Sequence, residues 1–490
     1  MTAPVALPQS QPDTKHPRYR TMRELWQVCR DFLAGTATVR AAREKYLPRH
    51  EAEDEASYNL RLLYAVVYNA FARAIDALTG LAFQNDPTLG EDVGPLTTAD
   101  WENINLQGTH GDVFARRLLL EGLTTGYVGV LVDMPPNPGN LTLAQERAQG
   151  IRPYWVMYRA EQIVNWRVGR QADGTIGLTL LVLDEPLEEP DGLFGHKTTA
   201  QFRVFRKDEP TGPVVWQVWR QLPNKQYAVT SEGVLTQPRI PFALGRFGPT
   251  ASDAWLDTRP PLYDLAELNI AHYRVATDRR HIMHLACVPI LAEIGSTPPK
   301  PGQQERVIGP GALVQIPNPE GDLKYVEPGG TALAPTREEL QDLERRMAQV
   351  SLAFLASDTR AAETAEAKRI DSAAQNATLS AAIRTLEDLL EEALGYHATY
   401  RQERPGGISL NREFEELNLT PEMIKVLSDM VAVGQLDLDT FWELLKQGRI
   451  LPPGFKADEV KARLLHDGEL TLPEEDDPLN DRVPLGGVPS

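Results

Sequence analysis

One long segment of the chain contains neither glycine nor proline. It runs from Thr336 to Leu394, between Pro335 and Gly395, in a chain that carries 36 Gly and 38 Pro in 490 residues. Because glycine and proline are the strongest helix breakers, the segment predicts a very long helical stretch. Its middle, Ala356–Glu366, is polar and alanine-rich and offers no large apolar side chain to bury. The segment therefore predicts two helices joined by a polar interval.

Both flanks of this interval carry an apolar stripe at helical spacing. The first stripe steps by three and four residues for about two heptads, and the second continues the pattern after the interval. We expect both stripes to be buried. Their members are Leu340, Leu343, Met347, Val350 and Phe354 in the first stripe, and Leu379, Ile383, Leu386, Leu390 and Ala393 or Leu394 in the second.

The chain is acidic, with a formal net charge of −18 at pH 7. Tight DNA binders neutralise phosphates with clustered Lys and Arg, so this balance excludes a conventional DNA-binding protein. The negative net charge is compatible with a protein that lets DNA pass without binding it tightly. It is equally compatible with any protein that its charge keeps in solution. Cys29 and Cys287 lie far apart, which disfavours a disulfide framework or a zinc knuckle. No apolar run approaches the 18 or so residues that a membrane span needs.

Motifs for catalysis are missing. The nearest approach to a phosphate-binding loop, "GLFGHKTT" (Gly192–Thr199), has the wrong spacing, and no G-x-G-x-x-G or G-x-S-x-G motif occurs in a suitable context. His281 and His284 lie three apart on an expected helix, but no third metal ligand accompanies them. We therefore expect no enzyme activity, no catalytic residues, no metal and no cofactor.

Helical and strand-like regions are separated along the chain, which predicts an α+β fold. Short helices are expected within 17–47, and a long helix from about Glu53 to Leu78, ending at Gly80. A helix at Asp112–Gly126 is expected to lead into a strand at Tyr127–Pro135, followed by an antiparallel β-rich module from Arg152 to about Phe247. Next comes a helix at Pro260–Ala286, whose apolar side carries Leu265, Leu268, His272, Val275, Ile282 and Leu285. The last expected elements are a Gly/Pro-rich insert at Ile294–Leu333 with the short strands "ALVQI" and "LKYVE" and, after Pro405, a possible strand "GGISLNREF" and three small helices.

The order of these elements resembles the portal proteins of tailed bacteriophages. In particular, it is similar to the portal family described as a domain of unknown function related to the head-to-tail connector. The resemblance extends from about Tyr46 to about Arg401. It is carried by "YNAFARAIDALTGLAF", by "GYVGVLVDMP" followed by "RPYWVMYRAEQIVNWRV", and by "ETAEAKRIDSAAQNATLSAAIRTLEDLLEEAL". None of these segments is a catalytic signature, and it is their order that makes the match specific.

The resemblance implies a portal-like architecture of wing, stem, clip, long helix and crown. Composition adds a disordered N-terminal tail and an acidic, disordered C-terminal tail. The expected regions are 1–19 for the N-terminal tail, 20–255 for the mixed α/β wing, 256–289 for the first stem helix, 290–335 for the clip, 336–355 for the second stem helix, 356–366 for the tunnel loop, 367–404 for the long helix that connects to the wing and crown, 405–470 for the helical crown and 471–490 for the acidic tail.

The resemblance also implies a function. Portal proteins form a ring, twelve-fold in the virion, at one capsid vertex, where double-stranded DNA is packaged and ejected through the central channel. The implied partners are other copies of the chain, DNA, the terminase large subunit, head-completion or adaptor proteins, and the major capsid and scaffolding proteins, with no membrane. The implied location is the virion, after assembly in the cytoplasm of the bacterial host.

Two groups of candidate site residues follow from the resemblance. The candidate DNA-channel residues are Ser357, Asp358, Thr359, Arg360, Lys368 and Arg369. The candidate partner-docking residues of the clip are Gln303, Gln304, Glu305, Arg306, Lys324 and Tyr325. A plainer interpretation of the basic channel residues is that Lys368 and Arg369 balance Glu363 and Glu366 on a solvated helix face.

Two other functions remain open. A different virion protein, such as a head–tail adaptor or a minor capsid protein, would lack the helix–insert–helix element followed by a long helix. An enzyme acting on nucleic acid is disfavoured because the chain has neither an acidic metal-binding constellation nor a nucleotide-binding motif.

Overall fold

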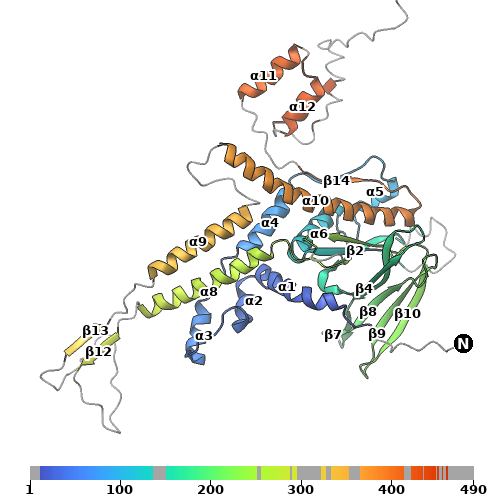
Figure 1. Ribbon diagram of the computed structural model, residues 1–490. Coiled ribbons are helices and arrows are strands. Elements are labelled where there is room, and N and C mark those ends of the chain that lie inside the picture. The colour runs from blue at the N-terminus through green and yellow to red at the C-terminus, as the bar shows by residue number, and fades with distance from the viewer. Residues whose placement is uncertain are drawn as a thin grey trace, which may run out of the picture. The chain divides into compact units, whose positions relative to one another are not determined.

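The structure is a computed structural model of a mixed α+β protein, as the sequence predicts (Figure 1). It describes residues 11–135, 150–250, 255–286, 290–294, 322–326, 333–352, 365–412, 421–433, 435–447, 450–451, 455 and 460–461. The chain divides into two compact units, Met1–Arg412 and Glu413–Ser490. The first unit contains the β-rich module and all the long helices.

Short helices open the first unit. Helix α1 begins at proline, which suits a first helical turn, and ends at Gly35, whose φ of 87° is open to glycine and strained for other residues. These helices and their neighbours are α1 (Pro17–Ala34), α2 (Thr36–Ala41), the 3₁₀ turn η1 (Arg43–Lys45), α3 (Glu55–Tyr64), α4 (Ala70–Ala82), α5 (Pro95–Trp101) and α6 (Gly111–Thr125).

Ordered structure begins before residue 20, inside the region 1–19 expected as an N-terminal tail. The His16 ring stacks on Trp166 with centroids 4.0 Å apart, and Tyr19 is buried and donates a hydrogen bond to the Glu161 carbonyl at 2.9 Å. Packing of these aromatic rings on the β-rich module therefore orders the chain before residue 20.

The single long helix expected from Glu53 to Leu78 is wrong, because two helices stand in its place. Ala65 is extended, with ψ of 122°, and the Val67 N–H donates to Thr36 Oγ1 at 3.2 Å. Asn69 then starts α4 by accepting from the Ala72 N–H at 3.1 Å, as an N-cap does. Helix α4 continues through Gly80 to Ala82. The hydrogen bond to Thr36 and the capping residue Asn69 thus outweigh a continuous apolar stripe.

The junction between α6 and the following strand is one glycine long. Gly126 lies in the left-handed region, with φ of 92°, and its N–H closes the helix onto the Gly122 carbonyl at 2.8 Å. A Cβ at this position would lie 2.9 Å from the Arg259 carbonyl oxygen. The chain can therefore turn directly from α6 into strand β2, as predicted.

The β-rich module is antiparallel, as predicted. Five strands pair in the order β10-β9-β8-β5-β4 and three in the order β11-β2-β3. The strands are β2 (Tyr127–Asp133), β3 (Tyr154–Arg159), β4 (Ile163–Arg170), β5 (Ile176–Asp184), β8 (Gln201–Arg206), β9 (Val214–Gln221), β10 (Tyr227–Leu235) and β11 (Phe242–Arg246), with the 3₁₀ turn η2 (Ala160–Gln162) between β3 and β4.

A separate hairpin, β6 (Leu187–Asp191) with β7 (Gly195–Thr199), contains most of the "GLFGHKTT" segment. The residues at its tip are exposed, and no helix follows the glycines. This geometry differs from the strand–loop–helix of a phosphate-binding loop.

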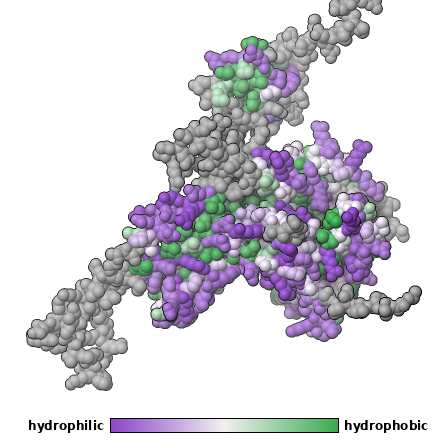
Figure 2. Space-filling model, in the orientation of Figure 1, coloured by the Kyte–Doolittle hydropathy of each residue, from purple (hydrophilic) through white to green (hydrophobic). Residues whose placement is uncertain are grey.

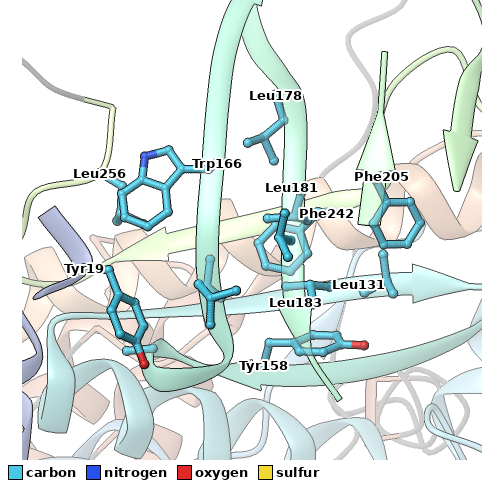
Figure 3. Close-up of a cluster of buried hydrophobic side chains, with 14 of the residues drawn as sticks. Tyr19, Leu131, Tyr158, Trp166, Leu178, Leu181, Leu183, Phe205, Phe242 and Leu256 are labelled. Atoms are coloured by element: carbon cyan, nitrogen blue, oxygen red, sulfur yellow. The ribbon is translucent and has the colours of Figure 1, made fainter. Parts of the chain in front are cut away.

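A hydrophobic cluster joins α1 to the two sheets (Figure 3). Tyr19 and Trp26 of α1 pack with β-strand residues such as Tyr127 and Leu181, and Trp26 lies edge-on between Tyr19 and Tyr127. The aromatic residues of the module thus form core instead of a stacking surface for bases, as expected.

The remaining elements of the first unit include the two helices of the breaker-free run. They are α8 (Tyr263–Ala286), β12 (Ile290–Ile294), β13 (Asp322–Val326), α9 (Leu333–Leu352), α10 (Ala365–Arg401) and the two-residue strands β1 (Thr88–Leu89) and β14 (Ile408–Ser409), which pair. Strand β13 covers most of "LKYVE", whereas "ALVQI" lies outside the described residues. Strand β12 was not predicted.

The second unit is a small helical module, as expected. It contains α11 (Pro421–Ala432) and α12 (Leu438–Gln447), and Trp442 and Leu445 of α12 are buried. The Trp442 ring meets Phe455 with centroids 5.6 Å apart. The third expected helix lies largely outside the described residues. None of the helices that the structure describes combines the length and apolar content needed to cross a bilayer.

Candidate functional site

The candidate site is a pair of long helices with a β-hairpin between them. Helices α8 and α9 run side by side in opposite directions, and β12 and β13 join between them as a hairpin with Ile290 opposite Val326 (Figure 1). The 37-residue helix α10 follows α9. This is the helix–insert–helix element with a long following helix that the sequence predicts.

The predicted apolar stripe on α10 is buried wherever the structure describes it, and the stripe on α9 is buried at two positions and half-buried at two. On α9, Leu343 and Met347 are buried and Leu340 and Val350 are half-buried. Every predicted position on α10 from Leu379 to Leu394 is buried. Phe354 lies outside the described residues.

The buried face of α8 differs from the predicted one. Leu265 and His272 are buried, but Leu268, Val275 and Ile282 are only half-buried, and Leu285 has no described side chain. The buried face includes small and polar residues, of which Asn269 bonds to the start of α4 and Thr277 bonds to the Tyr273 carbonyl of its own helix. Its further members are Ala266, Asn269, Tyr273, Ala276 and Thr277.

Asn269 fixes α8 to the start of α4. Its side chain is fully buried; Oδ1 accepts from the Phe71 N–H at 2.9 Å and Nδ2 donates to the Tyr68 carbonyl at 2.5 Å. The first N–H groups of a helix have no partner within the helix. The Asn269 amide of α8 therefore binds a backbone N–H in the first turn of α4, and this contact fixes the position of α8 against α4.

Arg61 of α3 makes a second buried link to α8. Its guanidinium, 1% exposed, pairs with both Glu53 oxygens at 2.8 and 2.7 Å, with Asp278 of α8 at 2.9 Å and with the Pro48 carbonyl at 2.7 Å. The hydrogen bonds from Arg61 hold the pKa of Glu53 below its usual value. All three nitrogens of the guanidinium are thus in use.

His272 lies between α8 and α9. It is 5% exposed, and its Nε2 lies 3.3 Å from Glu344 Oε1 of α9. Burial lowers the pKa of His272, and the nearby Glu344 offsets only part of that shift. The fold therefore favours the neutral form of the His272 imidazole in this pair.

The C-terminal end of α10 is fixed by a buried charge cluster. Asp100 of α5 accepts from His397 Nε2 at 2.9 Å and from Arg401 Nε at 2.7 Å, and Arg152 Nε lies 3.5 Å away. Burial alone would raise the pKa of Asp100, but the hydrogen bonds from His397 and Arg401 outweigh burial and lower it. Burial lowers the pKa of His397. Two basic groups of α10 thus bind one carboxylate of α5.

The predicted site residues are placed only in part. Lys324 and Tyr325 lie on β13, opposite Ala292 and Leu291 of β12. Lys368 and Arg369 lie near the start of α10, and their side chains are not described. The remaining candidates lie outside the described residues: Gln303, Gln304, Glu305 and Arg306 of the insert, and Ser357, Asp358, Thr359 and Arg360 of the interval.

Within the part of the chain that the structure describes, no group of three or more His, Cys, Asp or Glu side chains is placed to hold a metal ion. Near the end of α8, the His284 ring lies 5.2 Å from the Tyr64 ring.

We expect Arg61→Met to lower the free energy of unfolding by about 3–5 kcal/mol, because it leaves the Glu53 carboxylate buried without its partner. Glu53→Gln/Arg61→Met should recover part of this loss, since no unpaired charge then remains. Urea denaturation of the two variants measures both effects. A loss below about 1 kcal/mol in Arg61→Met would contradict the anchoring role.

Stability should decrease as the pH falls below about 6.5, the ordinary histidine pKa. The pKa of His397 and that of His272 are lowered in the fold, so the unfolded chain binds more protons than the folded chain in this range. His397→Gln should reduce the loss of melting temperature between pH 7 and pH 5.5, whereas His196→Gln, on the exposed β6–β7 hairpin, should not. Equal losses in both variants would show that His397 does not contribute.

Comparison with protein families finds one family model that matches this element. Residues 261–401 match the family model described as "Domain of unknown function (DUF4055)", a segment that begins just before α8 and ends with α10. The match confirms, for that segment, the resemblance to a family described as a domain of unknown function. A comparison with curated proteins finds no match.

Solved structures from gene transfer agent (GTA) particles are similar at low identity. A chain from the virion of a native GTA particle has 14% identity and a TM-score of 0.41, with 85% of this chain and 99% of that chain covered. A chain from the neck of an empty particle computed with C6 symmetry has 13% identity and a TM-score of 0.40, with 88% and 98% covered. One from the neck of a native particle computed with C12 symmetry has 12% identity and a TM-score of 0.41, with 85% and 99% covered. At these values the likeness assigns no function.

Proposed function

We propose that this chain is a phage portal protein, a virion head–tail structural protein that forms a twelve-membered ring at one capsid vertex. The channel of the ring conducts DNA during packaging and ejection. Terminase and head-completion proteins dock on it, and the ring itself has no catalytic activity. The observation that carries the proposal is the α8–hairpin–α9 element followed by α10, within the segment that matches the family model.

The anchoring of these helices supports a structural role. The buried Asn269 of α8 binds the start of α4, the buried Arg61 of α3 binds Asp278 of α8, and Asp100 binds the end of α10. In the described part of α8 beyond Asp278, by contrast, the side chains are half-buried or exposed. Helices held firmly over part of their length leave the rest free to contact other copies of the chain.

The charge balance supports a conduit that does not grip its DNA. Each Lys or Arg that neutralises a phosphate adds attraction, which would oppose movement along a channel. The exposed face of α9 carries both signs, with Glu338, Glu339 and Glu344 beside Arg345 and Arg346, and hydrophilic residues dominate the visible surface of the first unit (Figure 2). In this proposal Arg360, Lys368 and Arg369 make transient contacts with passing DNA.

A head–tail adaptor or a minor capsid protein is the alternative virion role. Such a protein needs neither the helix pair with its hairpin nor a long helix after it. The presence of both in one segment favours the portal role.

Deleting Ser357–Ala362 should leave ring assembly intact and impair DNA packaging or retention, because this polar interval has nothing large to bury and is proposed to face the channel. The measurements are sedimentation of the purified variant and DNA content of particles made with it. An equally long deletion, Asp191–His196 at the exposed tip of the β6–β7 hairpin, is the matched control and should change neither. A Ser357–Ala362 deletion that fails to fold would mean that the interval belongs to the core, and normal packaging would mean that it does not face DNA.

A further inference from the structure

A groove along α1 gathers positive charge in a chain that is otherwise acidic. The groove has a volume of about 660 Å³ and runs from Lys15 along α1 to Val28, with Lys45 and Tyr263 at its border. Its lining contains four cations and one carboxylate, against a net charge of −18 for the whole chain. The local sign is therefore the opposite of the overall sign.

Two of these cations are free to bind a ligand. Lys45 is paired with Asp31 at 2.8 Å and lies over the Tyr46 ring, and Lys15 lies over the Tyr19 ring at 5.1 Å. Arg20 and Arg23 are exposed, and neither has an ion-pair partner among the described residues. They are three residues apart on α1, so they lie on one helix face about 5–6 Å apart.

The groove also has an apolar side. Leu25 and Val28 are half-buried beside the arginines, and the rings of Tyr19 and Tyr263 line the same groove. Arginine fits carboxylates with a bidentate fork, and an aromatic and aliphatic floor suits apolar side chains. A ligand that matches both features carries carboxylates and apolar groups side by side.

Nucleic acid fits the groove less well. A duplex is held by many phosphate contacts, about six to ten in well-studied cases, whereas the groove lining holds four cations, of which Lys45 is already paired with a carboxylate. The exposed Glu24 directly follows Arg23 and also lines the groove, where it would repel a phosphate chain. A peptide can instead donate backbone or side-chain N–H groups to Glu24.

We propose that this groove is a docking site for a carboxylate-rich segment of a partner protein. Arg20 and Arg23 bind two carboxylates one helical turn apart, and Leu25, Val28 and Tyr263 receive an apolar side chain beside them. The site is independent of the proposed channel, because it uses residues of α1 and the start of α8 and none from the interval or the hairpin.

The test measures fluorescence anisotropy of a labelled amphipathic peptide that carries Glu pairs four residues apart next to Leu, titrated with the full-length protein. Arg20→Glu/Arg23→Glu should weaken binding at least about tenfold. Arg167→Glu/Arg170→Glu, an equally spaced and exposed pair on β4, makes the same charge change elsewhere and should weaken binding by less than about twofold. Circular dichroism establishes that both variants fold.

Two further probes separate the possible occupants. The same peptide with Gln in place of every Glu should not bind, because the arginine forks lose their carboxylates. A labelled DNA duplex should bind no more tightly to the wild type than to Arg20→Glu/Arg23→Glu. Unchanged binding of the acidic peptide to that variant would overturn the proposal, and so would duplex binding that this variant abolishes.

Discussion

Buried polar side chains fix the long helices of the first unit to its shorter ones. Asn269 closes the start of α4 from the side of α8, and Arg61 links α3 to the same helix through Asp278. Asp100 then receives His397 and Arg401 from the end of α10. Such groups are costly to bury unless all their hydrogen bonds are made, so each one admits few arrangements of the helices around it. The position of the helix pair depends on these contacts.

The amino-acid pattern predicts a helix correctly where the burial of one apolar face is enough to determine it. The stripes on α9 and α10 are buried or half-buried at every described position, because three-and-four spacing places those side chains on one face whatever they pack against. The break between α3 and α4 was missed because it depends on Thr36, which accepts from the Val67 N–H only in the folded chain. Strand β12 was missed because its partner β13 lies beyond a long insert.

The anchoring residues were missed for the same physical reason. Asp100 and His397 are 297 positions apart, and Arg61 and Asp278 are 217 apart, so no local spacing marks them as partners. The role of Asn269 was missed because the residue lies on a mostly apolar face of α8. The only local indication of that role is a polar residue among hydrophobic ones. The candidate channel residues stay predictions, because the structure does not describe the Ser357–Arg360 segment or the side chains of Lys368 and Arg369.

Together these features describe a chain whose buried polar contacts hold long helices in place, and the proposed function adds that copies of the chain associate into a ring. Electron microscopy of the purified full-length protein tests this most directly. The proposed function predicts rings with a central channel and twelve-fold or closely related symmetry, with the α8–α9 pairs arranged around the channel. A monodisperse monomer that persists at high concentration and across salt concentrations would contradict it.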